Sequence, residues 1–159
     1  MAGRIAVTNT SPLIALVGLD ELRLLPALFE HIVVPFEVWE ELVAKPGAPE
    51  PDELRAWPSI TFRPAPCPLL QAVGLDPGER AAIALALATP EAWVLLDDLA
   101  ARRVATELGL QVKGTLGVLL EAKRAGLVPA LKPLLARMTE AGCRLGPELL
   151  AAVLAAAGE

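Results

Sequence analysis

Five oxygen-bearing side chains either follow a predicted strand or lie on the helix that comes after one: Asn9, Glu41, Glu79, Asp97 and Asp98. Asp97 and Asp98 are adjacent and end an apolar run. In an open parallel sheet, ligands bind outside the carboxyl ends of the strands, so side chains in these positions lie where chemistry is usually done. Glu40, next to Glu41, is the nearest competitor for its role.

Several carboxylates at one edge of a sheet repel each other unless a divalent cation neutralises them or one keeps its proton. Oxygen ligands without His or Cys suit Mg²⁺ or Mn²⁺. Such ions activate water and stabilise the charge of an in-line phosphoryl displacement, as in many nucleases. His31, the single histidine, precedes a predicted strand and is not needed. The pattern therefore indicates a metal-dependent hydrolytic site.

The elements that must position these side chains alternate between strand and helix. Pro12 and Pro35 suit first helical turns, Thr10 or Ser11 would cap the first helix, and Thr115 would cap a later one. Short apolar runs predict strands at 4–8, 31–34, 60–63, 93–96 and 110–114. Helices are predicted at 13–19, 20–29, 35–44, 52–57, 76–87, 99–108, 115–123, 133–141 and 147–157. This alternation predicts a three-layer α/β/α sandwich with a short parallel sheet.

The length of 159 residues and the 54% hydrophobic content predict a single domain over residues 1–159, with C-terminal helices at about 130–157 packed on it. No apolar run reaches the length of a membrane helix, and the start of the sequence lacks the features of a signal peptide. We therefore expect a cytoplasmic protein without a membrane partner. Cys67 and Cys143 have no partner at ligand spacing, which argues against zinc or a disulfide framework.

The formal net charge of −5 argues against a surface that binds nucleic acid all over. A negative net charge remains compatible with local basic patches. Five basic residues form either a patch that binds the RNA backbone or a solvated face: Arg102, Arg103, Lys113, Lys123 and Arg124.

Five segments in order resemble the PIN domain family, and within it the VapC-like branch catalogued as a domain of unknown function, DUF3368. They are VTNTSPLIAL, VPFEVWEEL, LDPGERAAIALAL, VLLDDLAARRVA and KGTLGVLLEAKRAG, and they span nearly the whole chain. The resemblance implies a PIN-like fold and a metal-dependent endoribonuclease. It also implies the toxin of a toxin–antitoxin pair, with an RNA substrate, a small antitoxin partner and a homodimer.

By the same resemblance, the first family acid falls on Asn9, the helical glutamate on Glu41, the third acid on Glu79, and the fourth on Asp98 or Asp97. Asn9 departs from the family pattern, which has an acid at this position. An amide oxygen can coordinate a cation but brings no charge. Further candidates for supporting bound water or substrate are Thr10, Ser11, Thr115 and Arg102.

Other interpretations stay open at this stage. Asp76 and Glu79 could simply occupy the positive end of a helix, Glu41 could be a solvated helix residue, and Asp98 could be only a helix cap. Because Asn9 stands in place of the first family acid, a catalytically weakened or inactive PIN-like binding module is an alternative function. A phosphatase or receiver domain shares an acidic sheet edge, and Lys113 would suit it, but the order of the segments fits it poorly.

Overall fold

A computed structural model describes residues 3–46, 51–66 and 74–159. Within these ranges five strands form one parallel sheet in the order β3-β2-β1-β4-β5. The strands are β1 (Ile5–Thr8), β2 (His31–Pro35), β3 (Ile60–Arg63), β4 (Trp93–Leu95) and β5 (Gln111–Lys113). All neighbouring strands pair in parallel, which confirms the predicted short parallel sheet of a PIN-like α/β/α sandwich.

Helices connect the strands and continue beyond the last one. They are α1 (Thr10–Gly18), α2 (Leu24–Leu28), α3 (Phe36–Ala44), α4 (Pro51–Arg55), α5 (Pro77–Leu87), α6 (Leu99–Glu107), α7 (Thr115–Arg124), α8 (Lys132–Glu140) and α9 (Pro147–Ala156). Among the described residues, none of the helices combines the length and the hydropathy of a membrane-spanning segment.

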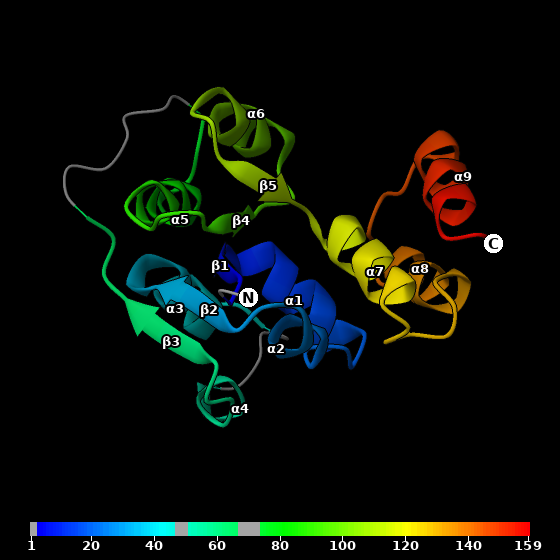
Figure 1. Cartoon of the computed structure of the whole chain (residues 1–159), viewed down its shortest axis with the longest axis horizontal. Coiled ribbons are helices and arrows are strands. Elements are labelled where there is room, and N and C mark those ends of the chain that lie inside the picture. Colours follow the sequence, from blue (N-terminus) through cyan, green and yellow to red (C-terminus); the bar gives the residue numbers. More distant parts are fainter. Residues whose placement is uncertain (1–2, 47–50, 67–73) are drawn as a thin grey trace.

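Successive strand residues face opposite sides of the sheet, as the two-residue period of a strand requires. Ala6 and Leu95 pack into a core with α1, α2, α7 and α8, whereas Val7 and Val94 pack into a second core with α5 and α6. Figure 1 shows the strands between these two groups of helices. The inner strands β1, β2 and β4 are therefore covered by helices on both faces, whereas the edge strands β3 and β5 stay partly exposed.

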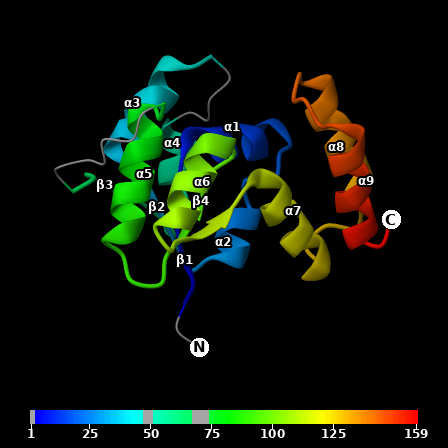
Figure 2. The ribbon, with the colours of Figure 1, turned by 90° about the horizontal axis from the view of Figure 1, so that it is seen from above.

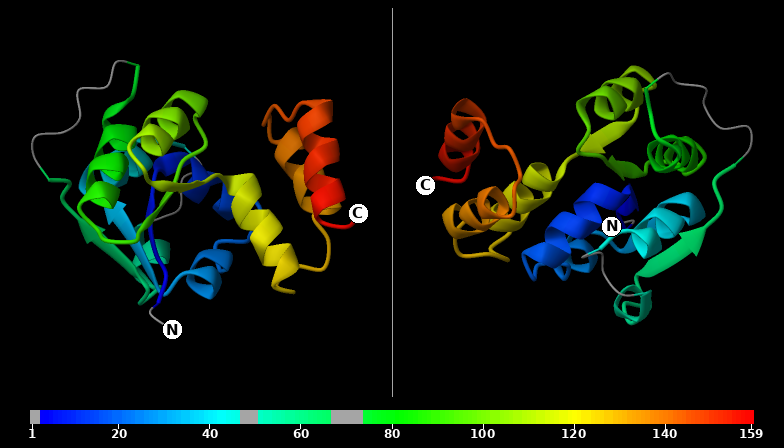
Figure 3. Two further views of the ribbon diagram at one scale, coloured as in Figure 1. Left: turned by 45° about the horizontal axis from the view of Figure 1, so that its top comes forward. Right: turned by 180° about the vertical axis from the view of Figure 1, so that it is seen from behind.

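The C-terminal helices α8 and α9 lie beside α7 at the end of the molecule away from α5 (Figures 2 and 3). Leu134, Leu135 and Met138 of α8 join the core that α1 and α7 share. Leu150 and Leu154 of α9 pack against the same core from outside, although no residue of α9 counts as buried within the described ranges.

The helix predicted at 20–29 is much shorter in the structure. Asp20 has a positive φ of 55°, and the helix α2 begins only at Leu24. Pro26 is its third residue, within the first turn, where the missing N–H removes no helical hydrogen bond. Pro26 thus limits how early the helix can begin.

The predicted caps at Thr10, Ser11 and Thr115 are also wrong. Asn9 and Gly114 occupy the N-cap positions of α1 and α7, and neither helix has a side-chain cap hydrogen bond. Thr10 and Thr115 are instead the first helical residues. Their hydroxyl groups are directed to carboxylates on other elements, as described below.

Candidate active site

Residues from four elements meet at the carboxyl edge of β1 and β4. Asn9 directly follows β1, and its backbone N–H donates to the carbonyl oxygen of Leu95 at the end of β4 (3.1 Å). The helix α3 starts directly after β2 and carries Glu41, while α5 brings its first turn to the same place. The topology therefore brings Asn9, Glu41 and Glu79 to one edge of the sheet, as the sequence predicts.

Glu41 joins the first turns of two helices. Its Oε2 accepts a hydrogen bond from the Thr10 hydroxyl group (2.8 Å), and its Oε1 accepts one from the backbone N–H of Gly78 (3.1 Å). Gly78 makes this approach feasible, because a Cβ atom at this position would lie only 2.7 Å from Glu41 Oε1. The carboxylate of Glu41 is thus held by α1 and α5, and Glu41 rather than Glu40 carries these contacts.

Glu79 forms a capping box with Asp76 at the start of α5. The Glu79 backbone N–H donates to Asp76 Oδ1 (2.7 Å), and the Asp76 N–H donates to Glu79 Oε2 (3.0 Å). The sequence signal for this motif is an acid three residues before a glutamate at a helix start. The prediction that these acids lie at the positive end of a helix is confirmed, with a specific pairing added.

The environment of Glu79 disfavours its charged form. Burial is the main reason that its pKa is raised, and the nearby acids Asp76, Asp98 and Glu41 raise it further, while the hydrogen bond from the Asp76 N–H partly opposes them. Only 8% of Glu79 is exposed. The acids of this edge are therefore close enough to repel one another.

The adjacent aspartates after β4 have different surroundings. Both oxygens of Asp97 accept hydrogen bonds from Thr115, one from its backbone N–H and one from its hydroxyl group, each 2.7 Å long. Asp98 is exposed and caps α6 through Oδ1, which accepts from the N–H of Ala101 (2.9 Å). In the described residues nothing donates to Asp98 Oδ2, so Asp98 has the freer carboxylate.

Asn9 is only 3% exposed, and its Oδ1 has no hydrogen-bond donor in the part of the chain that the structure describes. An unpaired buried polar atom costs about 1–3 kcal/mol and calls for an explanation. An amide oxygen among carboxylates is a suitable ligand for a hard divalent cation. The chemistry of the donor set therefore fits Mg²⁺ or Mn²⁺.

The side chains are not, however, gathered as tightly as a closed metal site requires. Across residues 3–46, 51–66 and 74–159, no three His, Cys, Asp or Glu side chains converge closely enough to hold an ion. Glu41 has both oxygens engaged by the protein, and Glu79 and Asp98 each have one engaged. A cation would have to draw the remaining oxygens inward.

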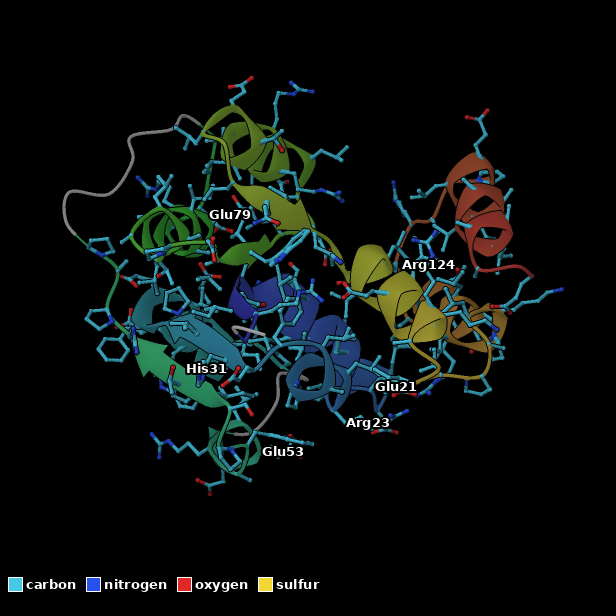
Figure 4. All side chains as sticks on the ribbon, viewed as in Figure 1. Glu21, Arg23, His31, Glu53, Glu79 and Arg124 are labelled. Atoms are coloured by element: carbon cyan, nitrogen blue, oxygen red, sulfur yellow. The ribbon has the colours of Figure 1, made fainter. Side chains whose placement is uncertain are left out.

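The supporting residues predicted from the sequence fall into two groups. Thr10 and Thr115 hold Glu41 and Asp97, so they position acids. Ser11 is exposed and, with Arg102, lines a cavity of about 650 Å³ next to Asp97. His31 lies at the other end of β2, near Glu30, apart from Glu79 as Figure 4 shows.

Sequence reasoning missed Gly78 at the site and the pairing of Arg4 with Glu121 elsewhere. Gly78 donates its N–H to Glu41, and only its place in the first turn of a helix hints at that role. Arg4 and Glu121, which contact each other from residues far apart in the chain, gave no local signal at all.

A family model described as a PIN domain, DUF3368, matches residues 5–159. No curated protein and no solved structure gives a significant match to the chain. The match covers all five strands of the sheet and each of the candidate acids. This chain therefore belongs to the PIN domain family.

Proposed function

We propose that the protein is a metal-dependent endoribonuclease of PIN type. PIN domains are generally nucleases that use divalent metal ions. The observation that supports the proposal is the contact of Glu41 with the first turn of α5, which carries Glu79, at the sheet edge where Asn9 follows β1 and Asp98 follows β4. Burial, together with nearby acids, raises the pKa of Glu79, and such a carboxyl group is typical of a site that binds a cation or moves a proton.

In this proposal Glu41, Glu79 and Asp98 hold Mg²⁺ or Mn²⁺, and Asn9 and Asp97 assist. The cation would supply Lewis acidity and lower the pKa of bound water. Glu41 is kept in place by Thr10 and Gly78, and Asp97 by Thr115. Hydrolysis joins a water oxygen to phosphorus and breaks the bond from phosphorus to the departing ribose oxygen, which takes up a proton.

A pair of variants separates the two adjacent aspartates. Asn caps helices as well as Asp does, so Asp98→Asn should preserve α6 and the fold. We expect Asp98→Asn to reduce RNA cleavage by at least about 100-fold and to weaken Mn²⁺ binding, because a ligand charge is lost. Asp97→Asn should reduce cleavage less. Undiminished cleavage by the Asp98 variant at low Mn²⁺ would refute the assignment.

A second candidate function is a binding module with little or no catalysis. Asn9 favours it, because the site lacks one charge and its acids are not drawn together within the described ranges. The variant Asn9→Asp tests this directly. If the natural chain shows no saturable Mn²⁺ binding in calorimetry and Asn9→Asp gains it, the natural chain is a binding module; saturable binding with RNA cleavage supports the nuclease.

The partners that we propose follow from the same family resemblance. The protein would be a cytoplasmic toxin, bound by a small antitoxin, and would form a homodimer. Support comes from α9, an apolar helix without a buried residue in the described structure, on which Leu149 is 48% exposed. We further propose that residues 1–159 form one domain. Light scattering of the purified chain measures its oligomeric state, and a monomer would contradict the dimer.

A further inference from the structure

A second cavity, of about 620 Å³, runs along β5 and α7. Its lining includes four basic residues, one acid and one aromatic ring: Arg4, Arg102, Lys113, Arg124, Glu121 and Trp93. We call this cavity the basic groove. It stands out because the whole chain has a formal net charge of −5. An excess of positive charge within an acidic protein attracts anions to that place.

Two of the cations in the basic groove already have an anionic partner. Glu121 accepts hydrogen bonds from Arg4, one of them 3.3 Å long, and from Lys113. Burial alone would raise the pKa of Glu121, but the hydrogen bonds and charges of Arg4 and Lys113 outweigh it and lower this pKa. Both cations also lie over the Trp93 ring, at 5.3 and 4.7 Å from its centre. Because cations cover this ring, it is poorly placed to stack on a base.

The other two cations are uncommitted. Neither Arg102 nor Arg124 forms an ion pair or a side-chain hydrogen bond with any residue that the structure describes. Arg124 is exposed near the end of α7, where Figure 4 labels it. By contrast, Lys123 beside it donates to the carbonyl oxygen of Pro129 and pairs with Glu159. The structure thus divides the basic residues of this region into engaged and free groups.

Arg102 connects the basic groove to the acidic edge. Arg102 and Gly114 line both the groove and the cavity that contains Asp97. A Cβ atom placed on Gly114 would lie 2.9 Å from Arg102 Nη1 and 3.1 Å from Asp97 Oδ1. The guanidinium group and the carboxylate therefore flank the same glycine, at the point where the groove reaches the candidate active site.

We propose that the basic groove binds the phosphate backbone of a single RNA strand and guides it to the acidic edge, an inference that rests on the proposed function for the choice of RNA. Arg102 and Arg124 bind phosphates directly, and Arg4 and Lys113 supply charge that Glu121 partly neutralises. Recognition is independent of sequence, because phosphate contacts carry no base information.

Direct binding measurements test this groove without any need for cleavage. The full chain, in EDTA, is titrated into fluorescein-labelled oligouridine and oligoadenosine, and anisotropy is read at several salt concentrations. Arg102→Ala and Arg124→Ala should each weaken binding roughly three- to tenfold for both RNAs and lower the salt slope by about 0.7 per lost phosphate contact. Arg103→Ala is the matched control, because Arg103 is the exposed neighbour that does not line the groove.

A variant that is expected to bind RNA more tightly excludes unfolding as the explanation of weaker binding by the arginine variants. Glu121→Gln removes the internal anion and leaves Arg4 and Lys113 free, so it should tighten RNA binding roughly three- to tenfold. A partly unfolded protein would not bind more tightly. If Glu121→Gln destabilises the chain too much to be measured, Arg124→Ala decides the question alone, since Arg124 is exposed and its loss should leave the fold intact.

Several outcomes would overturn the proposal. One is that the Arg102 and Arg124 variants bind RNA as Arg103→Ala does, and another is that the chain binds polyglutamate but neither RNA, which would indicate an acidic protein partner. Cleavage with Mn²⁺ is measured separately. RNA binding that depends on the groove, without cleavage, would refute the nuclease but support the RNA-binding groove. Cleavage that the groove variants leave unchanged would support the nuclease but refute the RNA-binding groove.

Discussion

Asp97 and Thr115 are joined by two hydrogen bonds of 2.7 Å, which tie the end of β4 to the start of α7. Because both oxygens of Asp97 are satisfied in this way, its neighbour Asp98 retains the freer carboxylate. The sequence leaves the fourth family acid on Asp98 or Asp97, and these contacts favour Asp98 as the candidate ligand, with Asp97 held in place by Thr115. This relationship leads to the first of four predictions.

Replacing Thr115 by Val keeps the shape of the side chain but removes the donor to Asp97 Oδ2. We expect the free energy of unfolding to fall by about 1–2 kcal/mol, since hydrogen bonds to charged groups contribute about 1.5–3 kcal/mol and Asp97 is only half-buried. Urea denaturation measures the change. Thr115→Ser retains the hydroxyl group and should lose less, so equal losses in the two variants would argue against a role for this hydrogen bond.

The variant Gly78→Ala should damage the site while leaving the fold intact. The added Cβ atom would lie 2.7 Å from Glu41 Oε1, so the carboxylate has to leave its place at the first turn of α5. We expect Mn²⁺ affinity to fall about tenfold, as when groups that orient ligands are changed. Ala is the better helix former by up to about 1 kcal/mol, so stability should hold.

Gly18→Ala is the control for this variant, because a Cβ atom at Gly18 would meet nothing within 4 Å. Calorimetric Mn²⁺ titrations of the two variants give the comparison. If Gly78→Ala binds Mn²⁺ like Gly18→Ala, the orientation of Glu41 does not matter for the cation.

Ionisation of Glu79 should make the metal-free protein less stable near neutral pH. Because burial and nearby acids raise the pKa of Glu79 in the fold, its protonated form stabilises the native state fully below the pKa of the unfolded chain. This contribution is lost as pH rises through the folded-state pKa. Gln keeps the acceptor for the Asp76 N–H, so Glu79→Gln in EDTA at pH 7 should withstand more urea than the natural chain.

Mn²⁺ should reverse the order of stability, so that the natural chain becomes more stable than Glu79→Gln. At 100 times the dissociation constant, a bound ion stabilises the natural chain by about 2.7 kcal/mol, and the Gln variant gains less because it lacks a ligand charge. Urea unfolding curves with EDTA and with Mn²⁺ provide the test. A Gln variant that is less stable than the natural chain in EDTA would contradict this account of Glu79.

Glu121 should give the opposite dependence on pH. Its hydrogen bonds with Arg4 and Lys113 lower its pKa in the fold, so the ionised group stabilises the native state above the pKa of the unfolded chain, ordinarily about 4.3. The contribution disappears as pH falls through the lowered value. The difference in unfolding free energy between the natural chain and Glu121→Gln should therefore shrink as the pH is lowered below about 4. The side chain is 26% exposed, so solvent weakens the effect, and a constant difference across this range would contradict it.

The strands were predictable because each lies in a short apolar run with clear ends. The run at 60–63 matches β3 in full, and the others differ from the observed strands only at their ends. Gly109 and Gly126 have positive φ angles of 83° and 75°, as expected of glycines that end helices. These signals are local, so neighbouring residues are enough to determine them. The prediction about Cys67 lies outside the described residues.

The partners of polar side chains were not predictable in this way. Thr10 and Thr115 are of a residue type that often caps helices, but tertiary contacts direct their hydroxyl groups to Glu41 and Asp97 instead. A carboxylate accepts a hydrogen bond more strongly than a neutral partner does, so a nearby acid competes well for a hydroxyl group. Which acids are nearby depends on the order of the strands.

The alternation of strands and helices, and the residue types at the carboxyl ends of the strands, follow from local periodicity and from the ends of apolar runs, so they can be predicted from the sequence. Which side chains meet depends on the way the elements pack together. This packing brought Asn9, Glu41 and Glu79 to one edge, distinguished Asp97 from Asp98, and placed Arg4 beside Glu121, 117 positions later in the chain. Such contacts depend on strand order and helix packing, which no short stretch of sequence contains.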